Sequence, residues 1–234
     1  MSSALSDDRS RQILDALAAL IIRQGYDKTS MIDVAQEVGV SRGTVYLYFA
    51  NKERLFEALV LRESTLYVEA WLQYVESNES VTSMGAIYRA VLHAVNSRPF
   101  MAAMLKHDRR IMGSYLRKPG NLFASLEAVS PWNNLLWTLQ EVGAVRQDIN
   151  PAVMTHIMDL LAYGLASADE FKPPGASPPF DATLEAIANM LDCVLTPADG
   201  GNRAAGREVI RGLAATFRDQ FETIKQQWIE ATEK

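Results

Sequence analysis

Apolar residues recur with helical spacing along almost the whole chain, and no stretch alternates with the period of two that is typical of a strand. Three stripes are the clearest: Ile13, Leu14, Leu17, Leu20 and Ile21; Leu55, Phe56, Leu59 and Val60; and Ile210, Leu213, Phe217, Phe221, Ile224 and Trp228. This pattern predicts an all-α protein of roughly ten helices without a sheet.

Capping residues and turn formers predict where several of these helices begin and end. Ser30 and Asp33 have the spacing of a capping box, which opens a short helix that stops at Gly39. Ser41 caps another short helix through Phe49, and Asn51 begins a long one that reaches about Tyr74.

In the second half of the chain, proline and glycine give most of the boundary signals. A proline is expected at the first position of two helices, one starting at Ser130-Pro131 and the other at Asn150-Pro151. The earlier of these helices is expected to end at Gly143 and the later one near Ala168. Residues 172–179 hold too many prolines for a helix, and Asp181 is expected to cap the next one. A last helix begins at about Arg203.

Composition and charge narrow the class of protein. The chain has 234 residues with 48% hydrophobic content and a net charge of −5, which favours a folded protein over a polybasic nucleic-acid binder. A single cysteine, Cys193, excludes an intrachain disulfide and a zinc site with several cysteines. We expect no signal peptide, and the apolar run 16–22 is too short to cross a bilayer. These features predict a cytoplasmic protein that does not insert into a membrane.

Residues 30–49 have the spacing of a helix-turn-helix, a helix pair that holds its second helix in the major groove of DNA. Ala35 is small where the two helices cross, and Gly39 permits the turn between them. Val40 and Val45 fill the wedge between the helices. The pattern alone also occurs in ordinary helical packing.

The residues around this motif resemble the tetracycline-repressor (TetR) family from about Arg9 to Val60. The resemblance is carried by Thr29-Ser30, Val34-Ala35, Gly39-Val40-Ser41-Arg42-Gly43-Thr44, Tyr46, Tyr48-Phe49, Asn51-Lys52-Glu53 and Leu55. It implies an all-helical homodimeric regulator with a three-helix DNA-binding domain at residues 1–56. Residues 57–234 would then form a larger helical domain for ligand binding and dimerisation. The family norm is a repressor that leaves a palindromic operator when its ligand binds.

Physical roles follow for the residues of the motif. Arg42 is able to make a bidentate contact with guanine, and Lys52 at the start of the long helix is the expected phosphate clamp. Gly43 lets the backbone approach DNA closely. The full set of expected DNA contacts is Thr29, Ser30, Ser41, Arg42, Gly43, Thr44, Tyr46, Leu47, Tyr48 and Lys52.

Each of these roles has an alternative. Tyr46 could be a half-buried core residue, Thr29 and Ser30 could only cap a helix, and Arg42 could be solvated. Leu47 departs from the family, which often has an aromatic or polar residue there; it can offer only apolar contact, for example to a thymine methyl.

Methionine and aromatic residues spread over the later helices predict a pocket for an apolar or aromatic effector, since such side chains form adaptable cavity walls. The expected lining is Trp71, Tyr88, Met104, Met112, Phe123, Trp137 and Met158. The alternative for each residue is an ordinary core position. We expect no cofactor, and no metal site because His93, His107 and His156 lack the spacing of metal ligands.

Two late stripes predict a homodimer built as an isologous four-helix interface. One stripe is Met154, Ile157, Leu161 and Leu165, and the other is Leu184, Ile187, Leu191 and Val194. Motifs of enzymes are absent from the sequence: no nucleophile elbow, phosphate-binding glycine loop or His-Glu metal helix occurs, so we expect no enzyme. A second hypothesis is a helical carrier of apolar molecules without sequence-selective DNA binding.

Overall fold

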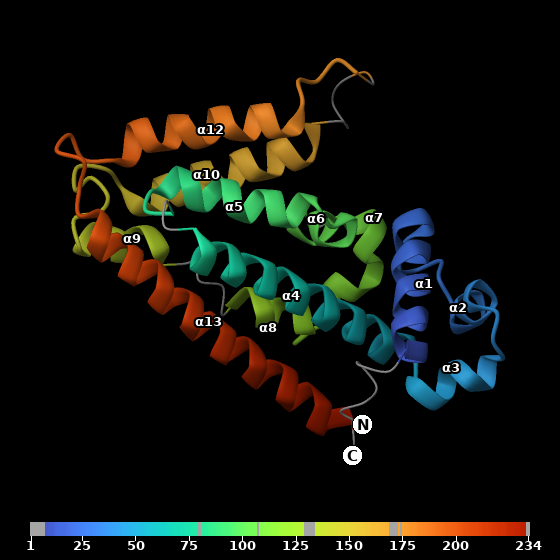
Figure 1. The fold of residues 1–234 in the computed structure, drawn as a ribbon. Coiled ribbons are helices and arrows are strands. Elements are labelled where there is room, and N and C mark those ends of the chain that lie inside the picture. Colours follow the sequence, from blue (N-terminus) through green and yellow to red (C-terminus); the bar gives the residue numbers. More distant parts are fainter. Residues whose placement is uncertain are drawn as a thin grey trace. The chain divides into compact units, whose positions relative to one another are not determined.

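The computed structural model describes residues 8–78, 81–106, 108–128, 134–168, 173 and 175–232, and every regular element in these ranges is a helix (Figure 1). The all-α prediction is therefore confirmed. The helices are α1 (Asp8–Gln24), α2 (Met31–Val38), α3 (Arg42–Tyr48), α4 (Lys52–Ser77), α5 (Met84–Asn96), α6 (Pro99–Leu105), α7 (Arg109–Met112), the 3₁₀ helix η2 (Gly113–Arg117), α8 (Leu122–Ala128), α9 (Leu135–Glu141), α10 (Pro151–Ala166), α12 (Phe180–Leu195) and α13 (Arg203–Thr232). None of these described helices combines the length and the apolar character needed to cross a bilayer.

Boundaries marked by local capping agree with the sequence. The side chain of Ser30 accepts the N–H of Asp33 while the carboxylate of Asp33 accepts the N–H of Ser30, which completes the predicted capping box. Asn150 caps α10, with Pro151 at its first position. The helix expected from Asn51 to about Tyr74 runs from Lys52 to Ser77.

One predicted cap is wrong. Asp181 does not cap α12: the helix begins at Phe180 after Pro179, and Asp181 lies in its first turn. The charge explains the difference, because a carboxylate in the first turn also stabilises the positive end of the helix dipole. The start signal at Ser130-Pro131 lies outside the described residues, and the next described helix, α9, begins at Leu135.

The chain divides into two compact units that are not the two halves of the sequence. The first unit holds residues 1–66, 99–129 and 220–234, and the second holds residues 67–98 and 130–219. Helices α4 and α13 each contribute residues to both units. The functional division at residues 56 and 57 stays a prediction.

The first unit is built around an aromatic cluster. The Phe56 ring lies 4.7 Å from both the Tyr26 and the Tyr115 ring, and 5.9 Å from the Phe100 ring, in edge-to-face geometry. These rings come from the turn after α1, from α4, from η2 and from α6. The cluster therefore ties the helix-turn-helix region to segments that follow much later in the sequence.

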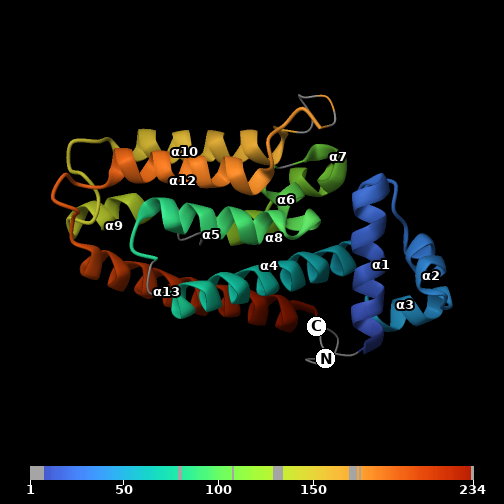
Figure 2. The ribbon, with the colours of Figure 1, turned by 45° about the horizontal axis from the view of Figure 1, so that its top comes forward.

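The second unit is held by a close approach between α5 and α12, which lie side by side in Figure 2. The N–H of Gly85 donates to Asp192 at 2.7 Å, and the hydroxyl of Ser83 donates to the other oxygen of the same carboxylate at 2.9 Å. A Cβ atom on Gly85 would lie only 2.1 Å from the carbonyl oxygen of Ala188. This contact requires glycine because any side chain would push the helices apart.

Gly85→Ala is therefore expected to lower the free energy of unfolding by about 1–3 kcal/mol, the usual cost of overpacking. Urea denaturation followed by circular dichroism measures the change. Gly212→Ala is the matched control: it also lies within a helix, and a Cβ there meets nothing within 4 Å. We expect the control to raise stability by up to about 1 kcal/mol. Equal stabilities of the two variants would contradict the close approach.

Candidate DNA-binding site

A tight turn at Gly39 sets the geometry of the helix pair α2–α3, which Figure 1 shows beside α1. Gly39 has φ of +74°, in the left-handed region that favours glycine, and its N–H donates to the carbonyls at the end of α2. Val34, Ala35 and Val45 are fully or almost fully buried on the inner side of the pair. This packing fixes α3 by its inner face and leaves its outer face exposed.

The expected recognition residues share this outer face. Ser41, Arg42, Gly43 and Tyr46 are exposed, and Leu47 is 85% exposed. The remaining residues of the predicted set on α3, Thr44 and Tyr48, are partly exposed. A seven-residue helix with this much of its surface uncovered is suited to entering a groove.

Arg42 and Tyr46 form a pair along the outer face of α3. The Arg42 guanidinium donates to the Tyr46 hydroxyl at 3.2 Å and lies 5.1 Å from the centre of the tyrosine ring. Both side chains are exposed, so neither is a core residue. Because the pair lies one helical turn apart, the guanidinium is held along the helix before any ligand arrives, which lowers the entropy cost of a directed contact.

Ser41 and Thr44 form the cap of α3. The Ser41 hydroxyl oxygen accepts the N–H of Thr44 at 3.1 Å and lies 2.9 Å from the Thr44 hydroxyl. If Ser41 donates to Thr44, the Thr44 hydroxyl keeps its own proton for an outside acceptor. This arrangement is compatible with the predicted contact of Thr44 with a phosphate or a base.

Thr29 and Ser30 are engaged within the protein. Thr29 is 2% exposed; its hydroxyl donates to the Gly25 carbonyl at 2.8 Å. Ser30 is exposed, but its hydroxyl donates to the Asp33 carboxylate at 2.7 Å, and these bonds hold the pKa of Asp33 below its usual range. Both residues stabilise local structure, and a phosphate contact by either stays a prediction.

The Lys52 side chain makes contacts within the protein that the sequence did not predict. Its ammonium lies 4.1 Å from the centre of the Tyr26 ring and donates to the Asp27 carbonyl at 3.4 Å. Burial lowers the pKa of Lys52, while the nearby Asp27 and Asp33 oppose that shift. An ammonium has three N–H donors, so the contacts with Tyr26 and Asp27 leave Lys52 with donors for a phosphate.

Tyr26 and Asp27 contact the predicted phosphate clamp Lys52, and sequence reasoning missed both of them. Burial raises the pKa of Tyr26 to about 12, so the ring that supports Lys52 stays neutral at physiological pH. Asp27 accepts from both the N–H and the hydroxyl of Ser114, bonds that lower its pKa. The only signal in the sequence is an aromatic residue directly after the helix-ending Gly25, and it says nothing about a distant lysine.

The expected effector residues fall in both units. Trp71, Tyr88 and Met158 are buried in the second unit, where the Tyr88 hydroxyl donates to the Met158 carbonyl at 2.8 Å. Trp137, in the same unit, is 50% exposed. The first unit holds the buried Met104 and Met112 and also Phe123, whose side chain lies outside the described residues. The effector site stays a prediction.

These features define a helix-turn-helix DNA-binding protein. A glycine turn joins the two helices, a serine caps the second helix, and an arginine on its outer face is held in place by a tyrosine. Residues 13–59 match the family model described as bacterial regulatory proteins, tetR family. This segment is therefore similar to the DNA-binding domain of TetR-family transcriptional regulators.

Relatives and solved structures extend the likeness beyond this domain. The chain is 29% identical over 157 residues to the HTH-type transcriptional repressor Rv1474c of Mycobacterium tuberculosis, covering 67% of this chain and 80% of the relative. It is 43% identical over 127 residues to the uncharacterized HTH-type transcriptional regulator YfiR of Bacillus subtilis, covering 50% and 60%. The fold is similar to the transcriptional regulator FadR of Bacillus subtilis, solved in complex with stearoyl-CoA, with a TM-score of 0.58, 17% identity and coverage of 78% and 97%.

Proposed function

We propose that this protein is a homodimeric repressor that binds a palindromic DNA operator and leaves it when an apolar or aromatic small molecule binds. The outer face of α3 carries the proposal, because Arg42 is exposed there and already oriented by Tyr46. Bidentate recognition of guanine needs such a fixed guanidinium. We propose no catalytic step, and operator binding would place the protein with the chromosome in the cytoplasm.

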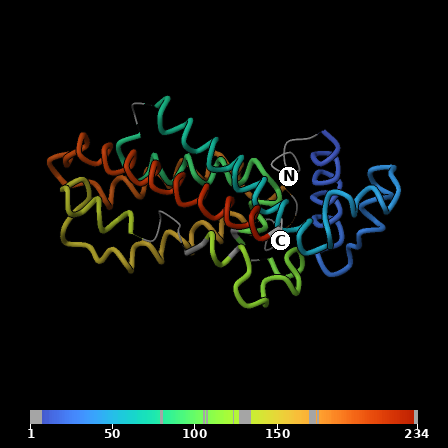
Figure 3. The backbone as a smooth tube through the Cα atoms, turned by 90° about the horizontal axis from the view of Figure 1, so that it is seen from below, coloured from blue at the N-terminus to red at the C-terminus, as the bar shows by residue number. Residues whose placement is uncertain are grey.

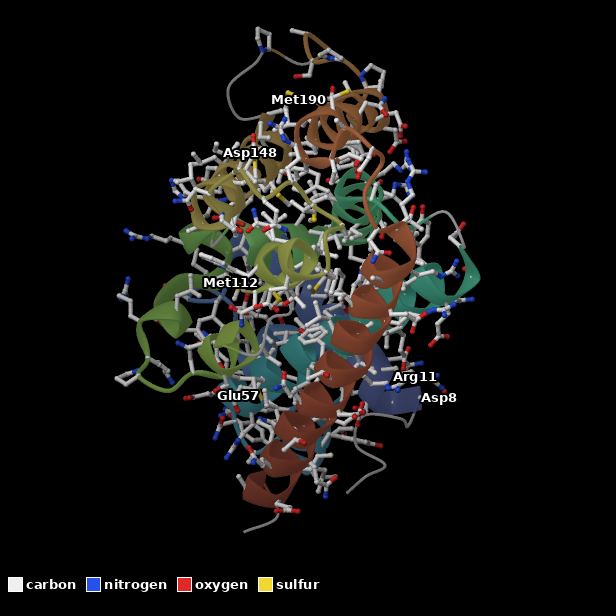
Figure 4. The ribbon with its side chains drawn as sticks, turned by 90° about the vertical axis from the view of Figure 1, so that its left-hand side faces the viewer. Asp8, Arg11, Glu57, Met112, Asp148 and Met190 are labelled. Carbon is white, nitrogen blue, oxygen red and sulfur yellow. The ribbon has the colours of Figure 1, made fainter. Side chains whose placement is uncertain are left out.

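Exposed apolar side chains on α10 and α12 support the dimer. These side chains are Val153, Ile157, Leu160 and Tyr163 of α10 and Met190 and Val194 of α12. Figure 4 labels Met190 on α12. Leu184 and Leu191, which the sequence placed on an interface stripe, are buried inside the second unit. We therefore propose an interface formed by the exposed set, with α10 and α12 of two copies packed as a four-helix bundle.

An apolar effector is supported by the methionine and aromatic content of the later helices and by the nature of one similar protein. The Bacillus subtilis FadR structure holds stearoyl-CoA, a long apolar chain on a charged carrier. We propose a ligand of this general chemistry, with a large apolar part. The alternative of a carrier without DNA binding has no support among the relatives, which are named as transcriptional regulators.

Selection from random DNA tests this proposal. The full-length protein is incubated with a pool of random duplexes, and bound DNA is amplified and sequenced over several rounds. We expect enrichment of a palindrome with half-site centres about one helical turn, 34 Å, apart. Stearoyl-CoA is then added as a probe, with an expected loss of operator affinity of about 5- to 150-fold. A pool without any enriched sequence would overturn the proposal.

A further inference from the structure

The C-terminal turns of α13 contact the first turns of α4, which begins with the expected phosphate clamp. The Trp228 indole N–H donates to a carboxylate oxygen of Glu57 at 2.8 Å. Figure 3 shows the end of α13 near the start of α4, and Figure 4 labels Glu57. All of these residues belong to the first unit.

Arg54 contacts both Glu57, on its own helix, and the same turn of α13. Its guanidinium bonds the Glu57 carboxylate at 3.1 Å and lies 5.8 Å from the centre of the Trp228 ring. It also donates to the Ala231 carbonyl at 3.3 Å. A cation at this position stabilises the negative end of the helix dipole of α13.

The Glu57 carboxylate joins three segments of the first unit. Its second oxygen accepts the Tyr115 hydroxyl from η2 at 3.3 Å, while Trp228 and Arg54 bind the other oxygen. The Glu57 side chain is only 12% exposed. Removing the Trp228 donor leaves the ion pair with Arg54 but takes one hydrogen bond from a largely buried carboxylate, and such a loss is unfavourable.

These contacts restrain the part of α4 that carries Lys52. Glu53, the next residue of α4, forms an ion pair with Lys118. The first two turns of α4 are thus held by directional polar contacts to α13, to η2 and to the segment after η2. The Lys52 ammonium lies over the Tyr26 ring while its backbone belongs to the first turn of α4. The position of the ammonium therefore depends on how the start of α4 is held.

We infer that the C-terminal turn of α13, through Trp228, is a positioning element for DNA binding. It fixes the start of α4 so that Lys52 meets a phosphate without further ordering. The inference rests on the proposed function and assigns to the long C-terminal helix a role in operator affinity. Trp228 acts through Glu57 and Lys52 and does not itself touch DNA.

Operator titrations with Trp228→Ala, Trp228→Phe and Lys52→Ala test the inference. Trp228→Ala is expected to weaken operator binding by about tenfold or more, because the start of α4 must then be ordered when DNA binds. Lys52→Ala removes one phosphate contact per protomer, which lowers the slope of log K against log salt by about 1.8 per dimer. We expect Trp228→Ala to lower this slope in the same direction.

The double variant separates positioning from general damage. If Trp228 acts through Lys52, Trp228→Ala combined with Lys52→Ala binds operator no more weakly than Lys52→Ala alone. Independent, multiplying losses would overturn the inference, as would an unchanged affinity of Trp228→Ala. If Trp228→Ala fails to fold, Trp228→Phe decides, because it keeps an aromatic ring at this position while it removes the N–H donor.

Controls distinguish this failure from failure of the proposed function. Gln227→Ala removes an exposed side chain from the same turn of α13 and is expected to leave operator affinity unchanged. Hydrogen exchange is expected to quicken at residues 52–57 in Trp228→Phe and to stay unchanged in α5 and α12. Wild-type protein that binds no duplex refutes the proposed function, whereas wild-type binding with unaltered Trp228 variants refutes only the role of α13.

Discussion

Arg42→Ala is expected to weaken binding of the selected operator by about 30-fold to 10⁴-fold. One bidentate contact with a guanine is worth about 1–3 kcal/mol, and a dimer loses two of them. The guanidinium is exposed and oriented by Tyr46, so the free protein carries no large cost for presenting it. Fluorescence anisotropy titration of a labelled operator at fixed salt concentration measures the loss.

Arg42→Lys tests whether Arg42 recognises guanine, and Arg89→Ala serves as its control. Arg42→Lys keeps the charge but loses the planar fork, so we expect it to lose preference for guanine at one position of each half-site while keeping most of the salt dependence. Arg89→Ala is the control: this arginine pairs with Glu185 in the second unit. Equal affinities of Arg42→Ala and wild type would contradict recognition through α3.

The helix-turn-helix was predictable because its determinants are local. The Ser30 and Ser41 caps and the turn at Gly39 each depend on residues within one helical turn, and the structure has all three. The inward-facing Ala35 and Val45 follow from helical spacing. Tyr26 beneath Lys52 was not predictable in this way, since the two residues meet only through the packing of the turn after α1 against α4.

Apolar stripes predicted burial without saying what covers each stripe. Leu184 and Leu191 have the same helical spacing as an interface stripe, yet they are buried within the second unit. Ile157 and Val194, from the same predicted stripes, are exposed. The periodicity of a helix identifies its apolar face, whereas the partner of that face depends on tertiary structure. The same limit explains why the predicted effector residues fall in both units.

Leu160→Glu is expected to convert the dimer into monomers and to weaken binding of the two-half-site operator by at least 100-fold. Leu160 is 58% exposed within the protomer, so the substitution leaves the fold of the chain intact. In the proposed interface, two-fold symmetry would bring two glutamates into an apolar surface, and burying unpaired charge is costly. Sedimentation equilibrium measures the dimer, and anisotropy titration measures operator affinity.

The loss of affinity arises because the second half-site is no longer bound as part of the same molecule. In a dimer the second recognition helix binds at a high effective concentration, which raises affinity by about 10²–10⁴-fold. Gln73→Glu adds the same charge at an exposed position of α4 in the second unit and is expected to leave both measurements unchanged. A Leu160→Glu protein that sediments as a dimer would show that α10 lies outside the interface. Binding to a single half-site should be equal in Leu160→Glu and wild type, because α3 and Lys52 are untouched.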